Sequence, residues 1–520
     1  MAIFTLVPLS FILIAPLIYL VVTRYQIYQK LSGFKGPFLA SVSDLWLLKQ
    51  SLKHRQHYAL EEVLEKYGSY ARIGPNMVVT NDPDLLRHMS APRSPWRRAA
   101  WYEIHKFDSE TDNIFSTTDE KKHTLLRSKL GPAVRLFGLL DLFFLQDYSG
   151  KGVDNLESSI EDQINIMLNM LRRDHTNSGR VVDMSRLSQY FTLDVLSSIA
   201  FGRAFGYLEA NEDLWNYISI TQKVIPMFEL ASDFPWLQKH LFGNPIVAKL
   251  MAPKDEDKVG QGKIAEIAHE MIGERYALAA NDAEKGRNQK ADMLGHFISH
   301  NLSQKEAESE AHLQILAGSE STSTSFNMTM LYIVTNPRVY KTLQAEIDNA
   351  VASGRISPDS VIKDSEARQL PYLQAVIWEG LRMCPPLFGL MTKVAPPGGD
   401  TFKGVFFPAG TEVVLSPSSV THRKDLIGED AHVFRPERWL EADEATHARY
   451  MSTVDLVFGS GRFGCLGKNI GMLELNKVFA ELLRHFDWTI EDSVKPVQER
   501  FGAGIWIQNG MNMIVTERKK

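Results

Sequence analysis

The chain has 520 residues, 44% hydrophobic and 23% charged, which is ordinary globular composition with room for a large core or several domains. A net charge of -5 and a pI near 6.3 leave no basic excess for a nucleic-acid partner, and no RNA-binding or zinc-finger spacing occurs. Two cysteines exclude a disulfide framework and fit a reducing compartment, where a lone cysteine serves either packing or chemistry.

The first predicted element is a membrane span. Ile3 to Val22 carries no charge and is long enough, at ~1.5 Å per residue, to cross a bilayer as a helix. Arg24, Lys30 and Lys35 follow it and no basic residue precedes it, so the positive-inside rule places the rest of the protein in the cytoplasm. A cleaved signal peptide is the alternative, but the segment has no charged n-region and no clear small-residue cleavage site.

We therefore predict a transmembrane anchor over residues 1–23 and a linker over 24–40, in which Gly36-Pro37 breaks the chain. No Pro/Gly/Ser-rich linker divides the remainder. Residues 41–520 are predicted to form one large unit, mainly α with a minor β portion.

Helical periodicity dominates the rest of the chain. Predicted helices cover Arg55–Tyr67, Asn155–Arg173, Val182–Phe201, Val259–Ala280, Ser303–Thr335, Arg338–Val351, Leu370–Met383 and Cys465–Phe486. A hairpin is predicted over Ala71–Thr80, with Gly74-Pro75-Asn76 as its turn, and short strands between Gly398 and Pro417. The polar segment Asn281–Lys290 is interpreted as an exposed connector.

The segment FGSGRFGCLG (Phe458–Gly467) fits two kinds of site. Its glycines spell G-x-G-x-x-G, the phosphate-binding pattern of dinucleotide folds, and VDLVF before them could be a strand. However, the chain ends soon afterwards, and no helix-strand alternation precedes the motif. The candidate acidic partner, Glu491, also lies further away than the ~20 residues expected. A nucleotide site is therefore disfavoured.

A cysteine-centred site explains the same segment better. The sequence places Cys465 where a helix begins, and free N–H groups there favour a thiolate. Glycines on both sides allow a flat ligand to approach the sulfur closely, and an apolar Phe458 lies nearby in sequence. A thiolate in this setting suits an axial ligand of haem iron. The other cysteine, Cys384, precedes Pro385-Pro386 and is interpreted as plain packing.

This segment resembles the haem-binding signature of the cytochrome P450 superfamily, and three further motifs follow the family order. AGSEST (Ala317–Thr322) is similar to the oxygen-activation motif, Glu379-Gly-Leu-Arg382 to the E-x-x-R motif, and FRPERW, which supplies Arg438, to the P-E-R-F element. The overall sequence resembles most closely the fungal members of the pisatin-demethylase type. The resemblance covers the whole chain and implies the cytochrome P450 fold, a haem b cofactor and Cys465 as its iron ligand.

The resemblance assigns proton delivery to Glu320 and Ser321, through water, and leaves room for oxygen at Gly318 beside Ala317. Ser321 stands where the family usually has Thr, so its hydroxyl is kept but its rotamer is less fixed. Thr322 could share the role. Hydrogen bonding of these hydroxyls to the preceding helical turn is the alternative.

Glu379, Arg382 and Arg438 are expected to form a buried charge triad behind the haem, as the family parallel implies. Glu379 and Arg382 lie three apart, on one helix face. The expected role of the triad is folding and haem retention rather than chemistry.

The remaining expected haem contacts follow from the resemblance. Phe458, Gly461 and Gly467 belong to the haem-binding signature itself. His123 and Arg127, four apart on one helix face, match the family's propionate-binding pair; a solvated helix end is the alternative for His123.

Two further cations are candidate haem contacts. Lys393 stands where relatives often carry a basic residue. Phe463 replaces the usual arginine two residues before the cysteine. The neighbouring Arg462 either reaches a propionate in its place or faces solvent.

Five apolar segments match the family's substrate-contacting regions and favour a lipophilic small molecule, although ordinary core packing is the alternative: Pro95–Phe115, Phe205–Phe242, the stretch before Ala317, Leu387–Met391 and Phe501–Trp506. The remaining histidines have no metal-ligand spacing.

The resemblance implies a monooxygenase of the endoplasmic reticulum membrane that uses O₂. No flavin or nicotinamide domain is present, so electrons are expected from a separate NADPH–cytochrome P450 reductase. Fungal secondary metabolism or detoxification is the expected setting. A same-fold enzyme that rearranges or dehydrates its substrate is one alternative, and a haem-binding sensor without turnover is the other.

Overall fold

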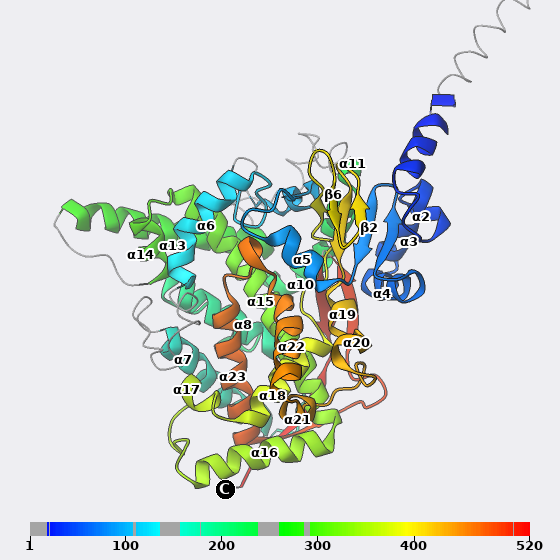
Figure 1. Cartoon of the computed structure of the whole chain (residues 1–520). Coiled ribbons are helices and arrows are strands. Elements are labelled where there is room, and N and C mark those ends of the chain that lie inside the picture. Colours follow the sequence, from blue (N-terminus) through cyan, green and yellow to red (C-terminus); the bar gives the residue numbers. More distant parts are fainter. Residues whose placement is uncertain are drawn as a thin grey trace, which may run out of the picture. The chain divides into compact units, whose positions relative to one another are not determined.

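The computed structural model describes residues 18–19, 21–107, 111–135, 156–176, 178–237, 259–284, 292–502 and 504–519. They form two compact units (Figure 1). Unit 1 takes its residues from Met1–Ala99 and Leu390–Val420, and unit 2 from Ala100–Gly389 and Thr421–Lys520. The structure is mainly helical with minor sheet, as predicted.

Unit 1 holds most of the sheet. Its five-stranded sheet has the order β1-β2-β8-β5-β3, and β6 and β7 form a separate hairpin. The strands are β1 (Tyr70–Gly74), β2 (Met77–Thr80), β3 (Arg97–Arg98), β5 (Lys393–Val394), β6 (Asp400–Phe402), β7 (Val405–Phe407) and β8 (Glu412–Leu415). The helices are α2 (Phe38–Val42), α3 (Leu45–Leu52), α4 (Gln56–Tyr67), α5 (Pro83–Ser90) and, at the boundary, α19 (Pro417–Thr421).

The predicted hairpin and strands of unit 1 are confirmed. β1 and β2 pair antiparallel around Pro75-Asn76, and Gly74 lies opposite Met77. β2 then pairs parallel with β8, which brings the start of the chain together with the segment after residue 390. A small core that includes Val78, Trp96 and Phe407 lies on this sheet.

Unit 2 is built from helices around α15. Its helices before α15 are α6 (Glu120–Arg135), α7 (Leu156–Leu171), α8 (Met184–Phe201), α9 (Tyr207–Ala210), α10 (Tyr217–Asp233), α11 (Pro235–Leu237), α13 (Gly260–Glu284) and α14 (Met293–Ser299). From α15 onward they are α15 (Gln304–Thr335), α16 (Pro337–Ala352), α17 (Asp364–Ala367), α18 (Pro371–Met383), α20 (Lys424–Ile427), α21 (Glu437–Glu441), α22 (Glu444–Val454) and α23 (Lys468–His485).

Short turns and two small sheets complete unit 2. A three-stranded sheet has the order β4-β12-β9, and β10 pairs antiparallel with β11. These strands are β4 (Val182–Asp183), β9 (Phe486–Ile490), β10 (Gln498–Gly502), β11 (Ile505–Asn509) and β12 (Asn512–Glu517). The 3-10 turns are η1 (Ala100–His105), η3 (Leu214–Asn216), η5 (Asp455–Phe458) and η6 (Gly461–Phe463), and η2 (Arg172–Thr176) is a π-helical turn.

The predicted long helix is confirmed as α15, and it positions the site. Ser303 caps it, because its hydroxyl accepts from the N–H of Glu306 while the Glu306 carboxylate accepts from the N–H of Ser303. Pro337 then starts α16 and prevents α15 from continuing. Figure 1 shows α15 beside α8, α18 and α23 within unit 2, and all three pack against it.

Several local predictions differ from the structure. Val182–Asp183, predicted as the start of a helix, forms β4, and α8 begins at Met184 because Asp183 caps it. The helix predicted to start at Cys465 starts at Lys468, because Gly467 is its N-cap. VDLVF is the end of α22 and a 3-10 turn, so the strand that a nucleotide site requires is absent at that point. The start of the predicted connector Asn281–Lys290 is helical, since α13 continues to Glu284 and residues 285–290 lie outside the described part.

The predicted membrane span, Ile3–Val22, lies almost entirely outside the described residues. Within the part of the chain that is described, no helix combines the length and the apolar character that crossing a membrane requires. The predicted division at residues 1–23, 24–40 and 41–520 stays a prediction.

Candidate active site

The cysteine loop, residues 458–467, connects η5 to α23. Gly459 and Gly461 have φ of 76° and 54°, in the left-handed region that favours glycine. A Cβ on Gly459 would lie 2.8 Å from the Phe463 carbonyl oxygen, so the loop closes only with glycine there. The Cys465 N–H donates to the Phe458 carbonyl at 2.6 Å, which ties the two ends of the loop together.

Cys465 lies three residues before α23, and its side chain is exposed. The protein atoms packed around the thiol desolvate it, and this raises its pKa. The N–H groups of Gly467 and Lys468 and the charge of Arg127 act in the opposite direction, because they favour the thiolate. The predicted N–H donors are therefore present at the sulfur, but desolvation outweighs their effect on the pKa of the free thiol. Gly467 leaves room beside the sulfur, since a Cβ there would lie 4.0 Å from Sγ.

Phe458 forms an apolar wall at the start of the loop. Its ring lies 6.5 Å from that of Trp378 on α18, in an edge-on arrangement. The Lys468 ammonium lies over the same ring, 5.6 Å from its centroid. The first residue of the predicted motif therefore packs onto the core of unit 2.

Helix α6 contacts the cysteine loop through the two predicted propionate ligands. The Arg127 guanidinium donates to the Gly464 carbonyl at 2.8 Å. The His123 ring, only 3% exposed, lies 5.2 Å from the ring of Phe463. His123 is therefore not a solvated helix end, and the i,i+4 pair faces the loop as the sequence pattern predicts.

Arg462 also turns toward α6. Its guanidinium lies 3.7 Å from the Glu120 carboxylate and 4.8 Å from the centroid of the Phe463 ring. The side chain is 16% exposed, so it does not simply face solvent. Arg462 thus lies in the same cationic neighbourhood as Arg127, while its contact with a propionate stays a prediction.

The predicted acid, Glu320, is buried on α15 and turned toward α8. The side-chain amide of Gln189 on α8 donates to its two carboxylate oxygens at 3.3 and 3.5 Å. Burial raises the pKa of Glu320 to about 7, against the opposing effects of Gln189 and the Arg186 charge. Glu320 can therefore gain and lose a proton near neutral pH.

The Ser321 hydroxyl donates to the Ala317 carbonyl one helical turn earlier, at 2.8 Å. This is the back-bonding that the sequence left open as an alternative. Ala317 is exposed, although much of α15 around it is buried. Gly318 packs closely against α8, since a Cβ on it would lie 2.8 Å from Leu196. Its predicted role in making room for oxygen stays a prediction.

Thr322 and a residue that the sequence reasoning missed, Glu474, connect α15 to α23. Glu474 is 1% exposed, and burial raises its pKa to about 8 although the Thr322 hydroxyl hydrogen-bonds to it. The signal was present in the sequence, because Glu474 interrupts the apolar run of Met472, Leu473 and Leu475. Gln189 was missed as well, since a single buried amide has no motif.

The predicted charge triad is present and completely buried. Arg382 donates two hydrogen bonds to the Glu379 carboxylate, at 2.8 and 2.9 Å, and Arg438 donates one at 3.0 Å. The Trp439 indole N–H and the Arg435 backbone N–H complete the shell at 3.0 and 2.9 Å. The three charged side chains are 0% exposed, which fits the predicted structural role.

Lys393 is the one predicted site residue outside unit 2. It lies on β5 of unit 1 and is 4% exposed. Its role toward a propionate stays a prediction.

Four of the segments that match the family's substrate-contacting regions meet at Trp101 in η1. Its indole N–H donates to Asp233 at the end of α10, at 3.1 Å. A Cβ on Gly389 would lie 2.7 Å from the Trp101 ring and one on Gly504 would lie 2.6 Å from the Gly389 Cα, so two glycines let the segments meet. Contact of these segments with a substrate stays a prediction.

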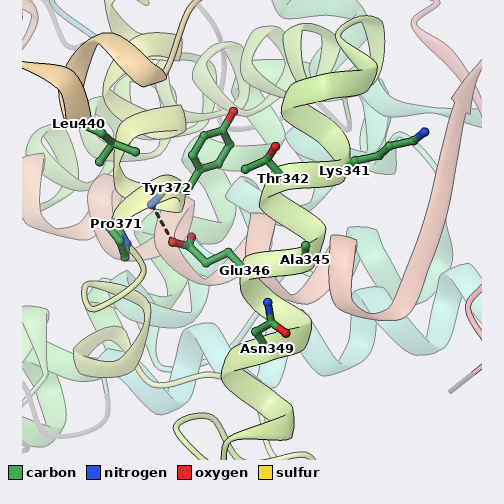
Figure 2. A pocket seen from close by; sticks show the side chains of 8 residues that line it. All are labelled: Lys341, Thr342, Ala345, Glu346, Asn349, Pro371, Tyr372 and Leu440. Carbon is green, nitrogen blue, oxygen red and sulfur yellow. Dashed lines mark hydrogen bonds between the residues drawn. The ribbon is translucent and has the colours of Figure 1, made fainter.

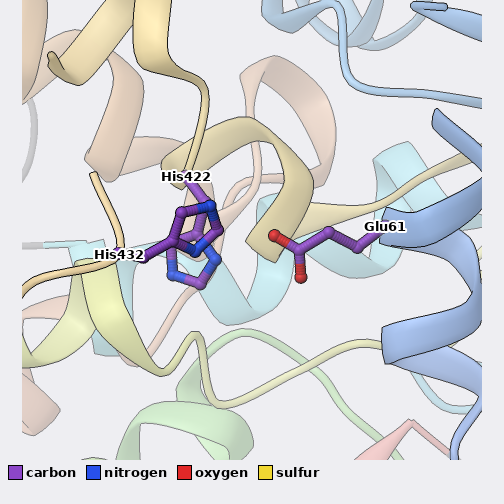
Figure 3. A group of neighbouring side chains, drawn as sticks. All are labelled: Glu61, His422 and His432. Atoms are coloured by element: carbon purple, nitrogen blue, oxygen red, sulfur yellow. The ribbon is translucent and has the colours of Figure 1, made fainter. Parts of the chain in front are cut away.

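Unit 2 has two other features that could suggest a binding site, a surface pocket and a pair of histidines. Figure 2 shows a surface pocket in which the Glu346 carboxylate of α16 accepts the N–H of Tyr372 at 2.9 Å, a helix-capping contact at the start of α18. Figure 3 shows the adjacent rings of His422 and His432, with centroids 5.0 Å apart. Among the described residues of unit 2, no third ligand group is grouped with this pair.

The cysteine loop and its neighbours fit a haem. The loop supplies a soft thiol donor with two N–H groups directed at the sulfur, and glycines that allow close approach. Arg127 and Arg462 supply positive charge next to it for the propionates.

Comparisons with known proteins agree with this geometry. The family model described as Cytochrome P450 matches residues 37–514. The chain is 39% identical over 520 residues to the cytochrome P450 monooxygenase ABA1 of Pyricularia oryzae, covering 98% of this chain and 97% of that protein. It is 36% identical over 485 residues to the aba1 monooxygenase of Botryotinia fuckeliana (92% and 90% covered). The pisatin demethylase of Fusarium vanettenii is 28% identical over 472 residues (88% and 84% covered).

Proposed function

The chain belongs to the cytochrome P450 family of monooxygenases, and from that premise we propose that it oxidises a lipophilic small molecule in fungal secondary metabolism or detoxification. The family uses haem iron with a cysteine thiolate as axial ligand, together with O₂ and a redox partner. The identity of the substrate class and of the partner is our proposal.

The cysteine loop is the observation that carries the proposal. Cys465 is the only exposed thiol among the described residues, since Cys384 is buried. Arg127 ties α6 to the carbonyl immediately before it, and Gly459 and Gly461 shape the loop around it. When bound, the haem would supply the activation of dioxygen; Cys465 would hold its iron, and the nearby cations Arg127 and Arg462 would face its propionates.

The residues of α15 hold and move protons. Glu320 has a pKa of about 7 and can carry a proton on its carboxylate at neutral pH. The Ser321 hydroxyl has to leave the Ala317 carbonyl, its partner in this structure, before it can pass a proton on. Thr322 offers a second hydroxyl next to it, backed by Glu474.

The substrate side of unit 2 favours a lipophilic molecule with aromatic or alicyclic parts. Trp101 packs edge-on against Tyr102 and Phe115, with ring centroids 5.1 and 6.1 Å away. Phe501 and Phe388 form a second aromatic pair, 5.7 Å apart. Aromatic and apolar walls bind such molecules by burial of apolar surface. One relative is named for the demethylation of pisatin, which is consistent with oxidation of a small organic molecule.

The partners are proposed from the sequence. The family model occupies residues 37–514, and we propose that electrons come from a separate NADPH–cytochrome P450 reductase. The uncharged segment Ile3–Val22 supports a single-pass anchor in the endoplasmic reticulum membrane, with the rest of the chain in the cytosol.

The carbon monoxide spectrum of the reduced full-length protein tests the haem site directly. A thiolate-shifted Soret band is expected for the unmodified chain and is expected to disappear in Cys465→Ser. The matched control is Cys384→Ser, the buried cysteine, in which the band should remain. A band that survives in Cys465→Ser would contradict the assignment.

Labelled dioxygen separates monooxygenation from a rearrangement or dehydration on the same fold. In product formed with reductase and NADPH, one labelled oxygen atom is expected per oxidation. A product that carries no label would reject oxygen insertion.

A further inference from the structure

The contact between α8 and α15 contains a polar pair that the assigned site does not explain. Gln189 and Glu320 are 4% and 3% exposed, and the carboxamide of Gln189 faces both carboxylate oxygens. Among the described side chains, no other donates a hydrogen bond to this carboxyl. The carbonyl oxygen of Gln189 is itself buried and has no hydrogen-bond partner.

A carboxamide suits an acid that changes its protonation state. Its NH₂ group donates to a carboxylate, and after a half-turn of the amide its carbonyl oxygen accepts from a protonated carboxyl group. The unpartnered oxygen of Gln189 is the acceptor that a protonated Glu320 requires. A lysine or arginine in this place would donate only, and would favour the ionised acid.

Arg186 acts on this pair through its charge. It lies one turn before Gln189 on α8, and its side chain is 25% exposed. Its guanidinium lies 3.9 Å from the Asp213 carboxylate and donates to the Ser219 hydroxyl at 3.4 Å. Ser219 in turn donates to Asp213 at 2.6 Å. These contacts hold Arg186 in place, and its positive charge favours the ionised form of Glu320.

We propose that Gln189 is a positioning residue that holds the Glu320 carboxyl against α8 in both protonation states. The proposal rests on the proposed monooxygenase function, in which Glu320 supplies protons. A proton from solvent adds to a Glu320 carboxylate oxygen and converts it to the neutral acid. It leaves from the same oxygen toward Ser321, and no electrons or other bonds change.

The charged and titratable groups that face Glu320 limit the pH response. From α8 they comprise Arg186, whose positive charge favours ionisation of Glu320. From α10 they comprise the buried Tyr217, whose phenol pKa is raised by burial and by the Glu320 charge. Asp194, also on α8, is instead held by the N–H groups of Gly206, Tyr207 and Leu208.

An infrared titration of the haem-loaded, full-length protein tests the proposal without turnover. The carboxyl C=O band of Glu320 is assigned by its loss in Glu320→Gln and followed between pH 5 and 9. Gln189→Leu removes the donor that favours the carboxylate, so the midpoint should move up by about one pH unit. Gln189→Glu places a second acid beside Glu320 and should move the midpoint in the same direction.

The matched control is Gln163→Leu, which changes a buried glutamine of α7 and should leave the Glu320 midpoint unchanged. Midpoints in Gln189→Leu and Gln189→Glu equal to that of the unmodified protein would overturn the proposal. So would an infrared spectrum that Glu320→Gln does not alter in this pH range.

A kinetic measurement tests the positioning role. With a fungal NADPH–cytochrome P450 reductase, NADPH consumption without added substrate is compared in H₂O and D₂O. Gln189→Leu should raise the solvent isotope effect about twofold, whereas Gln163→Leu should not. Equal isotope effects in the unmodified protein and both variants would reject the role. Failure of the proposed function would appear separately, as the lack of a thiolate-shifted carbon monoxide band in the unmodified protein.

Discussion

Glu379 and Glu320 are both buried carboxylates of unit 2, but their donors differ. Glu379 on α18 accepts from two guanidinium groups, an indole N–H and a backbone N–H, all within 3.0 Å. Among the side chains that the structure describes, Glu320 on α15 accepts only from the neutral amide of Gln189, at 3.3 and 3.5 Å. Glu379 is held in a network of ion pairs, whereas the hydrogen-bond partner of Glu320 carries no charge.

The difference separates a structural acid from a chemical one. Arginine keeps its proton at any physiological pH, so the groups around Glu379 cannot exchange protons with it. Burial raises the pKa of Glu320 to about 7, where a proton can be gained or lost, because no described cation is hydrogen-bonded to it and the charge of Arg186 offsets the burial only in part. Burial disfavours the charged form of both carboxylates. At Glu379 the two arginines offset this effect, whereas at Glu320 it appears as a raised pKa.

The largest expected effect comes from breaking the ion network. Glu379→Ala would leave Arg382 and Arg438 buried without their shared carboxylate, at a cost of about 3–5 kcal/mol in the free energy of unfolding. Denaturant unfolding measures it, and haem content should fall with stability. The control is Glu441→Ala, which removes an exposed partner of Arg435 and should cost less than about 1 kcal/mol. Equal costs for the two variants would contradict the structural role of Glu379.

Glu320 should make its own contribution to the pH dependence of stability, which the comparison with Glu320→Gln isolates from those of other buried acids. Its pKa is raised from 4.5 to about 7 in the folded state, so the unfolded state releases this proton first as the pH rises. The unfavourable contribution of Glu320 therefore appears above pH 4.5, grows to about 3 kcal/mol near pH 7 and is constant above it. Glu320→Gln should gain stability relative to the unmodified protein across that window. Unfolding free energies at several pH values measure the difference, and a difference independent of pH would contradict the shifted pKa.

Helices and motifs were predictable from the sequence because their signals are local. The capping box at Ser303 and the Asn336-Pro337 stop define α15 almost to the residue, and the spacing of Glu379 and Arg382 places both on one face of α18. The start of α23 was predicted three residues too early. Apolar periodicity does not reveal that Cys465 uses its N–H in a loop hydrogen bond to Phe458.

The hydrogen-bond partners of the predicted acids could not be identified from local sequence patterns. Gln189 lies 131 residues from Glu320 and becomes its neighbour only when α8 packs on α15. VDLVF was ambiguous for a different reason, since a short apolar run fits a strand and a helix equally well until its packing is known. Tertiary packing, rather than local preference, decided both.

The smallest predicted effect is that of Ser321→Ala, which tests whether Glu320, unlike Glu379, passes on its proton. Removing its hydroxyl in Ser321→Ala breaks one bond to the Ala317 carbonyl, which should change stability by less than about 1 kcal/mol. If the hydroxyl passes protons from Glu320, peroxide release per NADPH should rise, roughly tenfold at most, because the Thr322 hydroxyl next to it remains.

The control for Ser321 is Ser323→Ala on the same helix. Its hydroxyl is buried and donates to the Glu320 backbone carbonyl at 3.1 Å, so it bonds back to its own helix as the hydroxyl of Ser321 does. Coupling should be unchanged in that variant. Ser321→Thr restores the hydroxyl with a stiffer rotamer, so it should release no more peroxide than the unmodified protein. Equal coupling in Ser321→Ala and Ser323→Ala would mean that the hydroxyl of Ser321 serves only the helix, leaving Thr322 and Glu474 as the route to be tested.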